Sequence, residues 1–381
     1  MGSTKAGWDV AVIGLGAMGS AALCHLARRG CRVIGLERFE PGHERGSSHG
    51  DSRAIRLGYS EHPSYVPLVR SAFAGWRELE RLTGETILTT TGILEAGKPG
   101  SPMVRGSRDA CEMHGLDHEM LDAAEIMRRF PAFDLPADYS GVWQPEGGFL
   151  RADLANALHL RLAREAGATI RSRSRVTAIE PGANGVRVVL DGETIDAGSV
   201  VVACGPWIAD LVPALRPHVT LTRQVLCWYE PQRPDLFGLG ALPVFMIDGA
   251  DDLVYGFPDF SGAGLKCGSH FGSGTLSHGD DARQDAGPVD EARTRQFLQR
   301  YLPAGAGVLK AMKTCLYTMT PDEDFVIDLL PGDRRVVIAS PCSGHGFKFA
   351  SVIGEVLADL ATEGGTRHDI SRFRFGRFPA P

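Results

Sequence analysis

The chain has 381 residues, of which 43% are hydrophobic and 23% charged, and its formal net charge is −6 at pH 7. This length exceeds one average domain, and the apolar fraction is sufficient for a large buried core. The small negative charge, without a long block of like charge, argues against general binding to nucleic acid or to an anionic membrane surface.

The chain also lacks patterns for targeting and for metal binding. No apolar stretch approaches the about 20 residues of a membrane span. Residues 1–7 lack the apolar core of a signal peptide, so we expect a cytoplasmic protein. Eight cysteines are scattered without C-x-x-C spacing, which argues against a zinc or thioredoxin-type site, and no metal is expected. Most of these thiols are expected to be reduced and buried.

The first predicted elements form a β-turn-α-β unit. A short apolar strand at residues 8–13 leads into G-x-G-x-x-G at 14–19, and a helical stretch follows over 20–29. A second apolar run, 32–36, ends at Glu37. The alternative is a glycine-rich turn without a ligand. The strand, the helix and the acid at this spacing together favour a dinucleotide-binding site.

Each residue of this motif has a physical role in such a site. Gly14 permits the tight turn, Gly16 lets the backbone approach a pyrophosphate, and Gly19 lets the helix pack closely on the strand. The start of the helix then faces the phosphates, and Glu37 accepts hydrogen bonds from ribose hydroxyls. Glu37 alone does not separate NAD from FAD.

The segment 46–56 follows too soon for an ordinary NAD-binding unit to have continued. Its G-x-S-x-G pattern at 46–50 is typical of a hydrolase nucleophile elbow around Ser48, but that elbow needs a strand directly before it. The preceding residues are typical of a loop, so we interpret the match as chance. Arg53 and Arg56 share a side if the segment is helical and can then hold a carboxylate; the alternative is a pair of surface arginines.

The middle of the chain alternates between two kinds of pattern. Helical periodicity over 153–165 and strand patterns at 170–176, 186–190 and 200–203 indicate that the cofactor domain resumes near residue 150. The remaining parts, roughly 90–150 and 215–314, are richer in β-type and irregular sequence, which predicts a second lobe inserted into the first.

A strand is predicted at 264–270 in this second lobe. Its period of two places Lys266, Gly268 and His270 on one face. The neighbours of Lys266 are apolar and face the other way, so this lysine is either half-buried or a solvated edge residue.

The last segments form a strand at 314–320, with Cys315 and Tyr317 on one face, and an apolar strand at 335–339. A glycine-rich turn at 343–349 and a helical stretch at 351–360 follow. Backbone N–H groups at such a helix start suit an anionic group. The alternative is a structural turn with an exposed lysine.

Taken together, these segments resemble the monomeric sarcosine oxidase family, part of the D-amino-acid-oxidase-like flavoproteins. The resemblance runs from Val10 to Phe349, and its specific parts are 50–53, 264–266, Cys315 with Tyr317, and 343–349. It implies a mixed α/β plus α+β fold, in which a Rossmann-type FAD-binding domain carries an inserted substrate domain built on an antiparallel β-sheet. We expect the FAD-binding domain to comprise 1–90, 150–214 and 315–381, and the substrate domain 91–149 and 215–314.

The resemblance also implies roles for single residues. Cys315 matches the cysteine that binds FAD covalently through its sulfur. Lys266 matches the lysine beside the flavin that promotes reaction with oxygen, and Arg53 matches an arginine stacked near the flavin ring. Arg56 and Lys348 match the pair that clamps the substrate carboxylate.

Three further residues, Tyr255, Tyr317 and His270, match residues of the active site. The residues that the resemblance implies for FAD binding are Gly14, Gly16, Gly19, Glu37, Arg38, Ser47, Arg53, Val176, Cys315, Gly344, Gly346, Phe347 and Lys348. Two departures leave the substrate side chain open. Pro341 and Cys342 stand where the family has a glycine and an aromatic residue, and the segment 243–246 is hard to align.

The implied activity is oxidation of a secondary-amine amino acid, sarcosine or a similar N-methyl compound, by O2. The imine product hydrolyses to an aldehyde and an amine, and H2O2 is released. The expected partners are the amino acid and O2, with no nucleic acid or membrane, and the expected state is a monomer. Alternatives are oxidation of N-methyltryptophan, proline or pipecolate, or glycated amino acids; a flavin dehydrogenase with another electron acceptor; a flavin-binding protein without turnover; and a hydrolase using Ser48.

Overall fold

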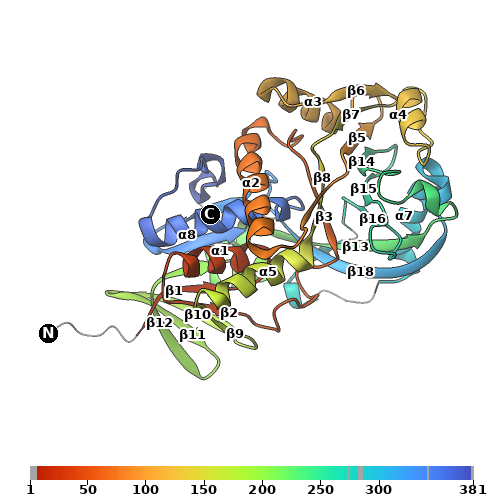
Figure 1. Ribbon diagram of the computed structural model, residues 1–381. Helices are drawn as coiled ribbons and strands as arrows, with labels where there is room; N and C mark the ends of the chain where they lie inside the picture. Colours follow the sequence, from red (N-terminus) through yellow and green to blue (C-terminus); the bar gives the residue numbers. More distant parts are fainter. Residues whose placement is uncertain (1–6, 273, 282–285, 341–342, 379–381) are drawn as a thin grey trace.

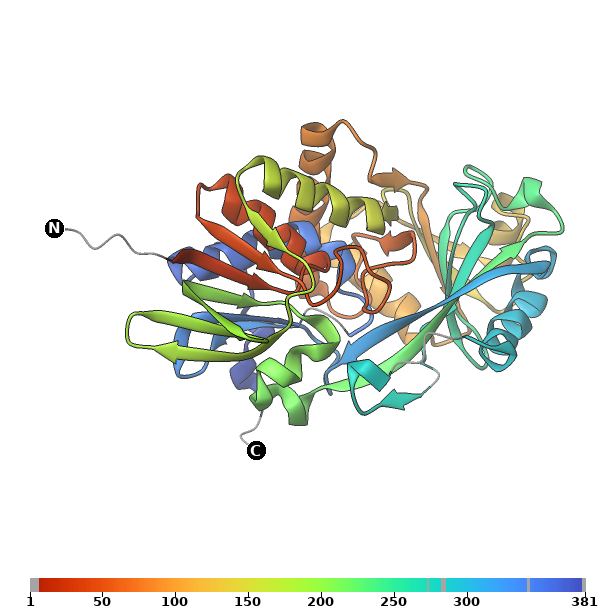
Figure 2. The same ribbon diagram turned by 90° about the horizontal axis from the view of Figure 1, so that it is seen from below.

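The computed structural model describes residues 7–272, 274–281, 286–340 and 343–378. The chain is built around two large sheets, which lie side by side in Figure 1 and are seen from below in Figure 2. Residues far apart in the sequence meet in both sheets. The departure at Pro341 and Cys342 lies outside the described residues.

The first sheet has eight strands in the order β10-β11-β12-β1-β2-β9, with β20 paired to β12 and β19 paired to β20. The pairs around β1 are parallel, which is typical of a nucleotide-binding sheet. The bounds are β1 Trp8–Ile13, β2 Val33–Leu36, β9 Thr169–Arg171, β10 Val176–Gly182, β11 Gly185–Leu190, β12 Glu193–Val202, β19 Val326–Leu330 and β20 Asp333–Ser340.

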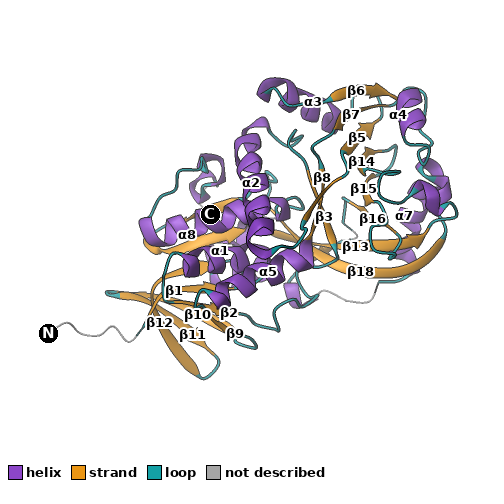
Figure 3. Ribbon diagram, viewed as in Figure 1, coloured by secondary structure: helices purple, strands orange, loops and turns teal. Residues whose placement is uncertain are grey.

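Helices cover one face of this sheet (Figure 3), and the apolar residues of that face form one buried cluster with them. Helix α1 packs against α5 and α8, and α2 packs against α8. A Cβ atom on Gly354 of α8 would lie 2.6 Å from the Ala21 Cβ of α1, so the two helices approach closely. The bounds are α1 Ala17–Arg28, α2 Val66–Thr83, α5 Ala152–Glu165 and α8 Ala350–Glu363.

The second sheet has nine strands in the order β17-β13-β16-β15-β14-β5-β7-β6, with β18 paired to β13. It is antiparallel except for the pair β14–β5. Its strands are β5 Ile93–Gly97, β6 Glu119–Asp122, β7 Ser140–Gln144, β13 Thr220–Glu230, β14 Val244–Asp248, β15 Leu253–Phe257, β16 Leu265–Ser269, β17 Thr275–Leu276 and β18 Val308–Met319. Its helices are α3 Pro102–His114, α4 Ala123–Arg129 and α7 Pro288–Tyr301, whereas the short helix α6 Ile208–Leu211 follows β12 and packs against β10 of the first sheet. The expected domain boundary at 314/315 falls inside β18.

A small third sheet connects the two regions. It pairs β8 (Gly148–Arg151) with β3 (Ser52–Ile55) on one side and with β4 (Leu88–Thr90) on the other. Residues 52–55 are therefore a strand, so the helical spacing considered for Arg53 and Arg56 does not apply. The strand expected at 170–176 is likewise wrong, because β9 ends at Arg171 and β10 begins at Val176.

The mixed α/β architecture predicted from the sequence is confirmed. The seven described cysteines are free thiols, and five of them are buried. Among the described residues, no helix has both the length and the apolar composition that crossing a membrane requires.

Candidate functional site

A cavity of about 410 Å³ is lined by residues from all three sheets. It brings together side chains from segments that are more than 300 residues apart, such as Arg38 and Lys348. The residues singled out from the sequence that line it are Gly14, Gly16, Glu37, Arg38, Ser47, Arg53, Arg56, Val176, Tyr255, His270, Tyr317, Gly344, Gly346, Phe347 and Lys348. Gly19, Lys266 and Cys315 lie behind this lining.

One end of the cavity is formed by the glycine motif and the start of α1. Gly14 has φ +85°, and a Cβ atom there would lie 2.7 Å from the Ala203 carbonyl oxygen. A Cβ on Gly16 would lie 2.9 Å from Ser48 Oγ, and one on Gly19 would overlap the Gly14 carbonyl. Gly14 and Gly19 cannot be replaced without a shift of the backbone, because a Cβ atom at either position would collide with backbone atoms. The result is a surface of backbone at a helix start, which fits a pyrophosphate.

Glu37 lies at the end of β2 and is buried. Its carboxylate accepts hydrogen bonds from the backbone N–H groups of Leu15 (2.9 Å) and Phe39 (3.0 Å), and His43 Nε2 lies 3.3 Å away. Burial opposes ionisation, but the bonds from His43 and the two N–H groups lower the pKa of Glu37 below its ordinary value. An ionised acceptor beside the motif fits a ribose, so this end has the groups that an adenine dinucleotide requires.

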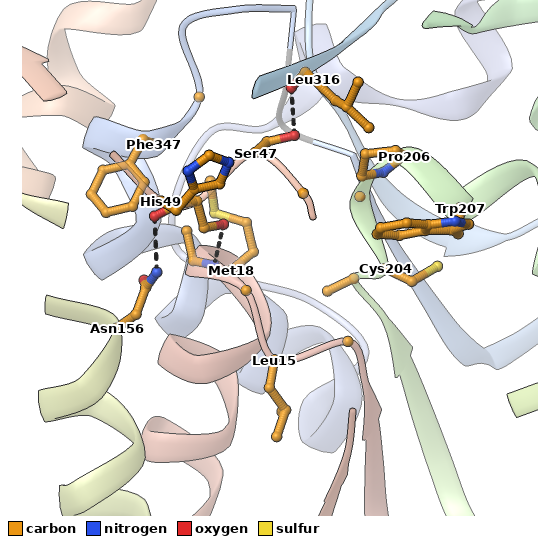
Figure 4. Close-up of a pocket in the computed structure, with 18 of the residues that line it drawn as sticks. Leu15, Met18, Ser47, His49, Asn156, Cys204, Pro206, Trp207, Leu316 and Phe347 are labelled. Atoms are coloured by element: carbon orange, nitrogen blue, oxygen red, sulfur yellow. Dashed lines mark hydrogen bonds between the residues drawn. The ribbon is translucent and has the colours of Figure 1, made fainter. Parts of the chain in front are cut away.

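Another part of the cavity wall is held together by Arg53. Its Nη2 donates to the carbonyl oxygens of Ser47 (3.0 Å) and His49 (2.5 Å), and its guanidinium lies 5.9 Å from the Phe347 ring centroid. Ser47 Oγ donates in turn to the Leu316 carbonyl (2.6 Å), a bond drawn in Figure 4. This bond ties the loop after β2 to β18.

Cys315 lies on β18 beside this arginine and is 3% exposed. Its Sγ is 3.9 Å from Arg53 Nη2 and 3.8 Å from the Ser47 carbonyl oxygen. Burial raises the pKa of the Cys315 thiol, and the charges of Arg53 and Lys266 oppose that rise. The thiol therefore lies next to Arg53 and Lys266, one residue before Leu316, which lines the cavity.

Lys266 is not the solvated edge lysine that was one of the two expectations. It is 2% exposed, and its Nζ donates to the Gly50 carbonyl (2.6 Å), the Ser52 carbonyl (2.7 Å) and Ser52 Oγ (3.1 Å). The ammonium also lies 4.6 Å from the Phe257 ring centroid. Burial, helped by the charge of Arg53, lowers the pKa of Lys266 well below its ordinary value.

Arg56 and Lys348 lie at the other end of the cavity, and both are buried. Arg56 Nη2 is 2.6 Å from Glu61 Oε2, and Arg56 Nε is 3.0 Å from Glu95 Oε1. Lys348 Nζ donates to the His345 carbonyl (2.7 Å) and to Tyr59 Oη (3.3 Å). Burial and the charge of Arg56 lower the pKa of Lys348 to about 7, and Glu61 opposes that shift.

Two tyrosines and a histidine line the cavity between these groups. Tyr255 and Tyr317 interact through their hydroxyl groups, and the ring centroids of Tyr317 and His270 are 6.0 Å apart. Burial raises the pKa of Tyr317 well above its ordinary value and lowers that of His270, so both are neutral near pH 7. Gly344 has φ +77°, and a Cβ there would lie 2.6 Å from the Tyr317 ring, so this turn requires glycine.

The sequence interpretation missed three polar groups of this site, namely Tyr59, Glu61 and Glu95. The signal for Glu95 was present, because an acidic residue inside the apolar run 93–96 is rarely buried without a partner. The hydrolase alternative has no structural support: no strand directly precedes Ser48, and its Oγ accepts the Ala17 backbone N–H (3.0 Å).

The chain is similar to known proteins over nearly its whole length. The model of a family described as FAD dependent oxidoreductase (DAO) matches residues 9–360. The chain is 38% identical over 375 residues to monomeric sarcosine oxidase of Bacillus sp. (strain NS-129), covering 97% of each chain. It is 37% identical over 374 residues to N-methyl-L-tryptophan oxidase of Yersinia pestis (strain Pestoides F), covering 97% of this chain and 99% of that one. A solved structure of NikD, an amino acid oxidase essential for nikkomycin biosynthesis, has a TM-score of 0.86 at 30% identity and covers 97% of each chain.

Proposed function

The chain belongs to the DAO family of FAD-dependent oxidoreductases, and from that premise we propose that it oxidises the secondary amine of a small N-methyl amino acid, such as sarcosine, with O2. The observation that carries this proposal is the pair of buried cations Arg56 and Lys348, which line the same cavity as the predicted flavin-binding residues. A carboxylate held there lies in the cavity of the cofactor.

The residues present fit FAD. The backbone at Gly14 and Gly16, with Glu37 beside it, would hold the adenosine and pyrophosphate part. Arg53 and Phe347 would lie by the flavin ring. We further propose that FAD is attached covalently through Cys315, a proposal supported by the thiol's position beside Arg53 at the edge of the cavity.

The substrate would be bound by its carboxylate. Arg56 and Lys348 offer charge-assisted hydrogen bonds, which fix the orientation of an amino acid as well as its position. Glu61 occupies one edge of Arg56, so the substrate carboxylate has to compete with it. Tyr255, Tyr317 and His270, kept neutral by burial, would enclose the amine without adding positive charge.

When bound, FAD supplies the acceptor for a hydride from the carbon beside the nitrogen and returns the two electrons to O2, which gives H2O2 and an imine that hydrolyses to an aldehyde and an amine. The buried Lys266, held behind the cavity lining by the carbonyl oxygens of Gly50 and Ser52, would supply positive charge that favours reduction of O2. Such a cation favours O2 over another electron acceptor.

A second substrate is favoured by a specific observation. The N-methyl-L-tryptophan oxidase is 37% identical to this chain, and the sarcosine oxidases are 37–39% identical. We test both with purified protein and a panel of sarcosine, N-methyltryptophan, proline, pipecolate and a glycated amino acid, following H2O2 and aldehyde. Oxidation of sarcosine with equal amounts of H2O2 and formaldehyde supports the proposal. Turnover of a panel member without H2O2 would instead indicate a dehydrogenase.

A further inference from the structure

Besides Glu61, the Arg56 guanidinium contacts a second acid, Glu95, which does not line the cavity. Glu95 lies on β5 and is fully buried, whereas its neighbours Leu94 and Ala96 point into the apolar cluster on the other face of the strand. Glu95 Oε1 is 3.0 Å from Arg56 Nε. The contact is ionic rather than a well-aligned hydrogen bond, since neither atom has a hydrogen-bond partner among the described residues.

The other oxygen of Glu95 is held by two donors. Oε2 accepts from Ser107 Oγ (2.7 Å) and from Gln144 Nε2 (2.9 Å). The amide of Gln144 cannot turn, because its Oε1 accepts the Gly58 backbone N–H at 2.7 Å. Arg56 Nε therefore faces one oxygen of Glu95, and Gln144 Nε2 faces the other. A carboxylate offers an acceptor to both nitrogen groups, whereas the amide of a glutamine offers an acceptor to only one.

Glu61 and Glu95 hold different edges of the same guanidinium. The Glu61 side chain is 27% exposed and lines the cavity, so a bound ligand can replace it. Glu95 does not line the cavity and cannot be reached from it. Burial raises the pKa of Glu95 above its ordinary value, and the charge of Arg56 and the bond from Ser107 oppose the rise.

We propose that Glu95 is a positioning residue for substrate binding: it holds the Nε edge of Arg56, so that the Nη2 edge remains directed toward the cavity when a substrate carboxylate competes with Glu61. This inference rests on the proposed function, in which Arg56 binds the carboxylate. Without Glu95, the Arg56 guanidinium either stays paired with Glu61 or turns away from the cavity. In both cases the substrate carboxylate binds less tightly. Because Glu95 touches no reacting atom, the rate at saturating substrate changes little.

The test compares the intact flavoprotein with the variants Glu95→Ala, Glu95→Gln and Arg56→Ala. Leu94→Val, a change on the opposite face of the same strand, controls for loss of packing. We measure kcat and KM with sarcosine, the flavin content, and the Kd of propionate from the flavin absorbance. Glu95→Ala is expected to raise KM and Kd at least tenfold, about 1.4 kcal/mol, with kcat within threefold and flavin content unchanged. Glu95→Gln raises both at least threefold, and Leu94→Val changes neither.

The outcomes separate the inference from the proposed function. If Arg56→Ala weakens propionate tenfold and Glu95→Ala leaves its Kd within twofold, Glu95 has no positioning role and the substrate site stands. If Arg56→Ala also leaves Kd within twofold, Arg56 does not bind the carboxylate, and both the proposed substrate site and the role of Glu95 are wrong. A fall in kcat and flavin content without a change in Kd would show a merely structural role. If Glu95→Ala does not fold, the isosteric Glu95→Gln tests the inference: a rise of at least threefold in KM and Kd supports it, and a smaller change contradicts it.

Discussion

Carboxylate binding should weaken as the pH rises through neutrality, because one of its two cations is a buried lysine. Burial and Arg56 lower the pKa of Lys348 to about 7. Below that pH the ammonium is charged and binds a carboxylate; above it the free protein loses the charge. A bound carboxylate raises the pKa of Lys348 again. Between the pKa of the free protein and the higher pKa of the complex, Kd should therefore rise up to tenfold per pH unit. From pH 7 to 9 the limit is about a hundredfold, or about 2.7 kcal/mol.

Three neighbouring groups, His345, Tyr59 and Glu61, do not titrate in this window. Burial lowers the pKa of His345 to about 4, and it raises that of Tyr59 well above its ordinary value. Arg56 lowers the pKa of Glu61 against the effect of burial. A simple monocarboxylate such as propionate is ionised throughout, so a change in its Kd reports on the protein.

The assay is a titration of the flavin absorbance with propionate at pH 6 to 9, for the wild type and for Lys348→Arg. Arginine stays charged over this range, so its curve should be flat. The reasoning is refuted if the wild-type Kd is independent of pH, or if Lys348→Arg keeps the same slope. A slope in the variant would point to another group, such as Glu95, whose pKa is raised by burial.

Three further predictions concern the cofactor. Lys266→Met should slow the reaction of the reduced protein with O2 by about 100-fold or more, while anaerobic reduction by substrate changes little; normal oxygen reactivity in stopped flow would exclude the role. Gly19→Ala should yield protein without flavin, because its Cβ overlaps the Gly14 carbonyl, whereas Gly365→Ala, with nothing within 4 Å of its Cβ, should keep its absorbance. Acid-precipitated wild type should stay yellow and Cys315→Ala should release its flavin; release from the wild type would disprove covalent attachment.

The parts of the fold that the sequence could predict are those set by local patterns. The glycine motif, the helix expected at 153–165 and the apolar strand at 335–339 each depend on spacing along one segment, and they correspond to α1, α5 and β20. The split of the strand expected at 170–176 was not visible, because both halves have β-type residues and only the sheet decides where pairing stops. For the same reason β18 begins earlier than its apolar pattern indicated.

The residues of the candidate site show the same difference between local patterns, which could be predicted, and contacts between distant segments, which could not. Residues in or beside a motif, such as Glu37 and Lys348, could be singled out because the motif implies what they face. The burial of Lys266 could not be predicted from its own strand, since it follows from carbonyl groups of residues 50 and 52 on a distant segment. The pair Arg56 and Glu95 likewise joins two segments, and an ion pair across a fold leaves no periodic trace in either one.

The most direct test of the central claim is anaerobic mixing of the purified yellow protein with sarcosine, with glycine as the matched primary amine. The account predicts that sarcosine bleaches the flavin absorbance near 450 nm, that glycine does not at the same concentration, and that admitting air restores the colour with release of H2O2 and formaldehyde. If sarcosine and the other secondary amines of the panel leave the absorbance unchanged, the protein is not an oxidase of N-methyl amino acids and the assignment of its substrate is wrong.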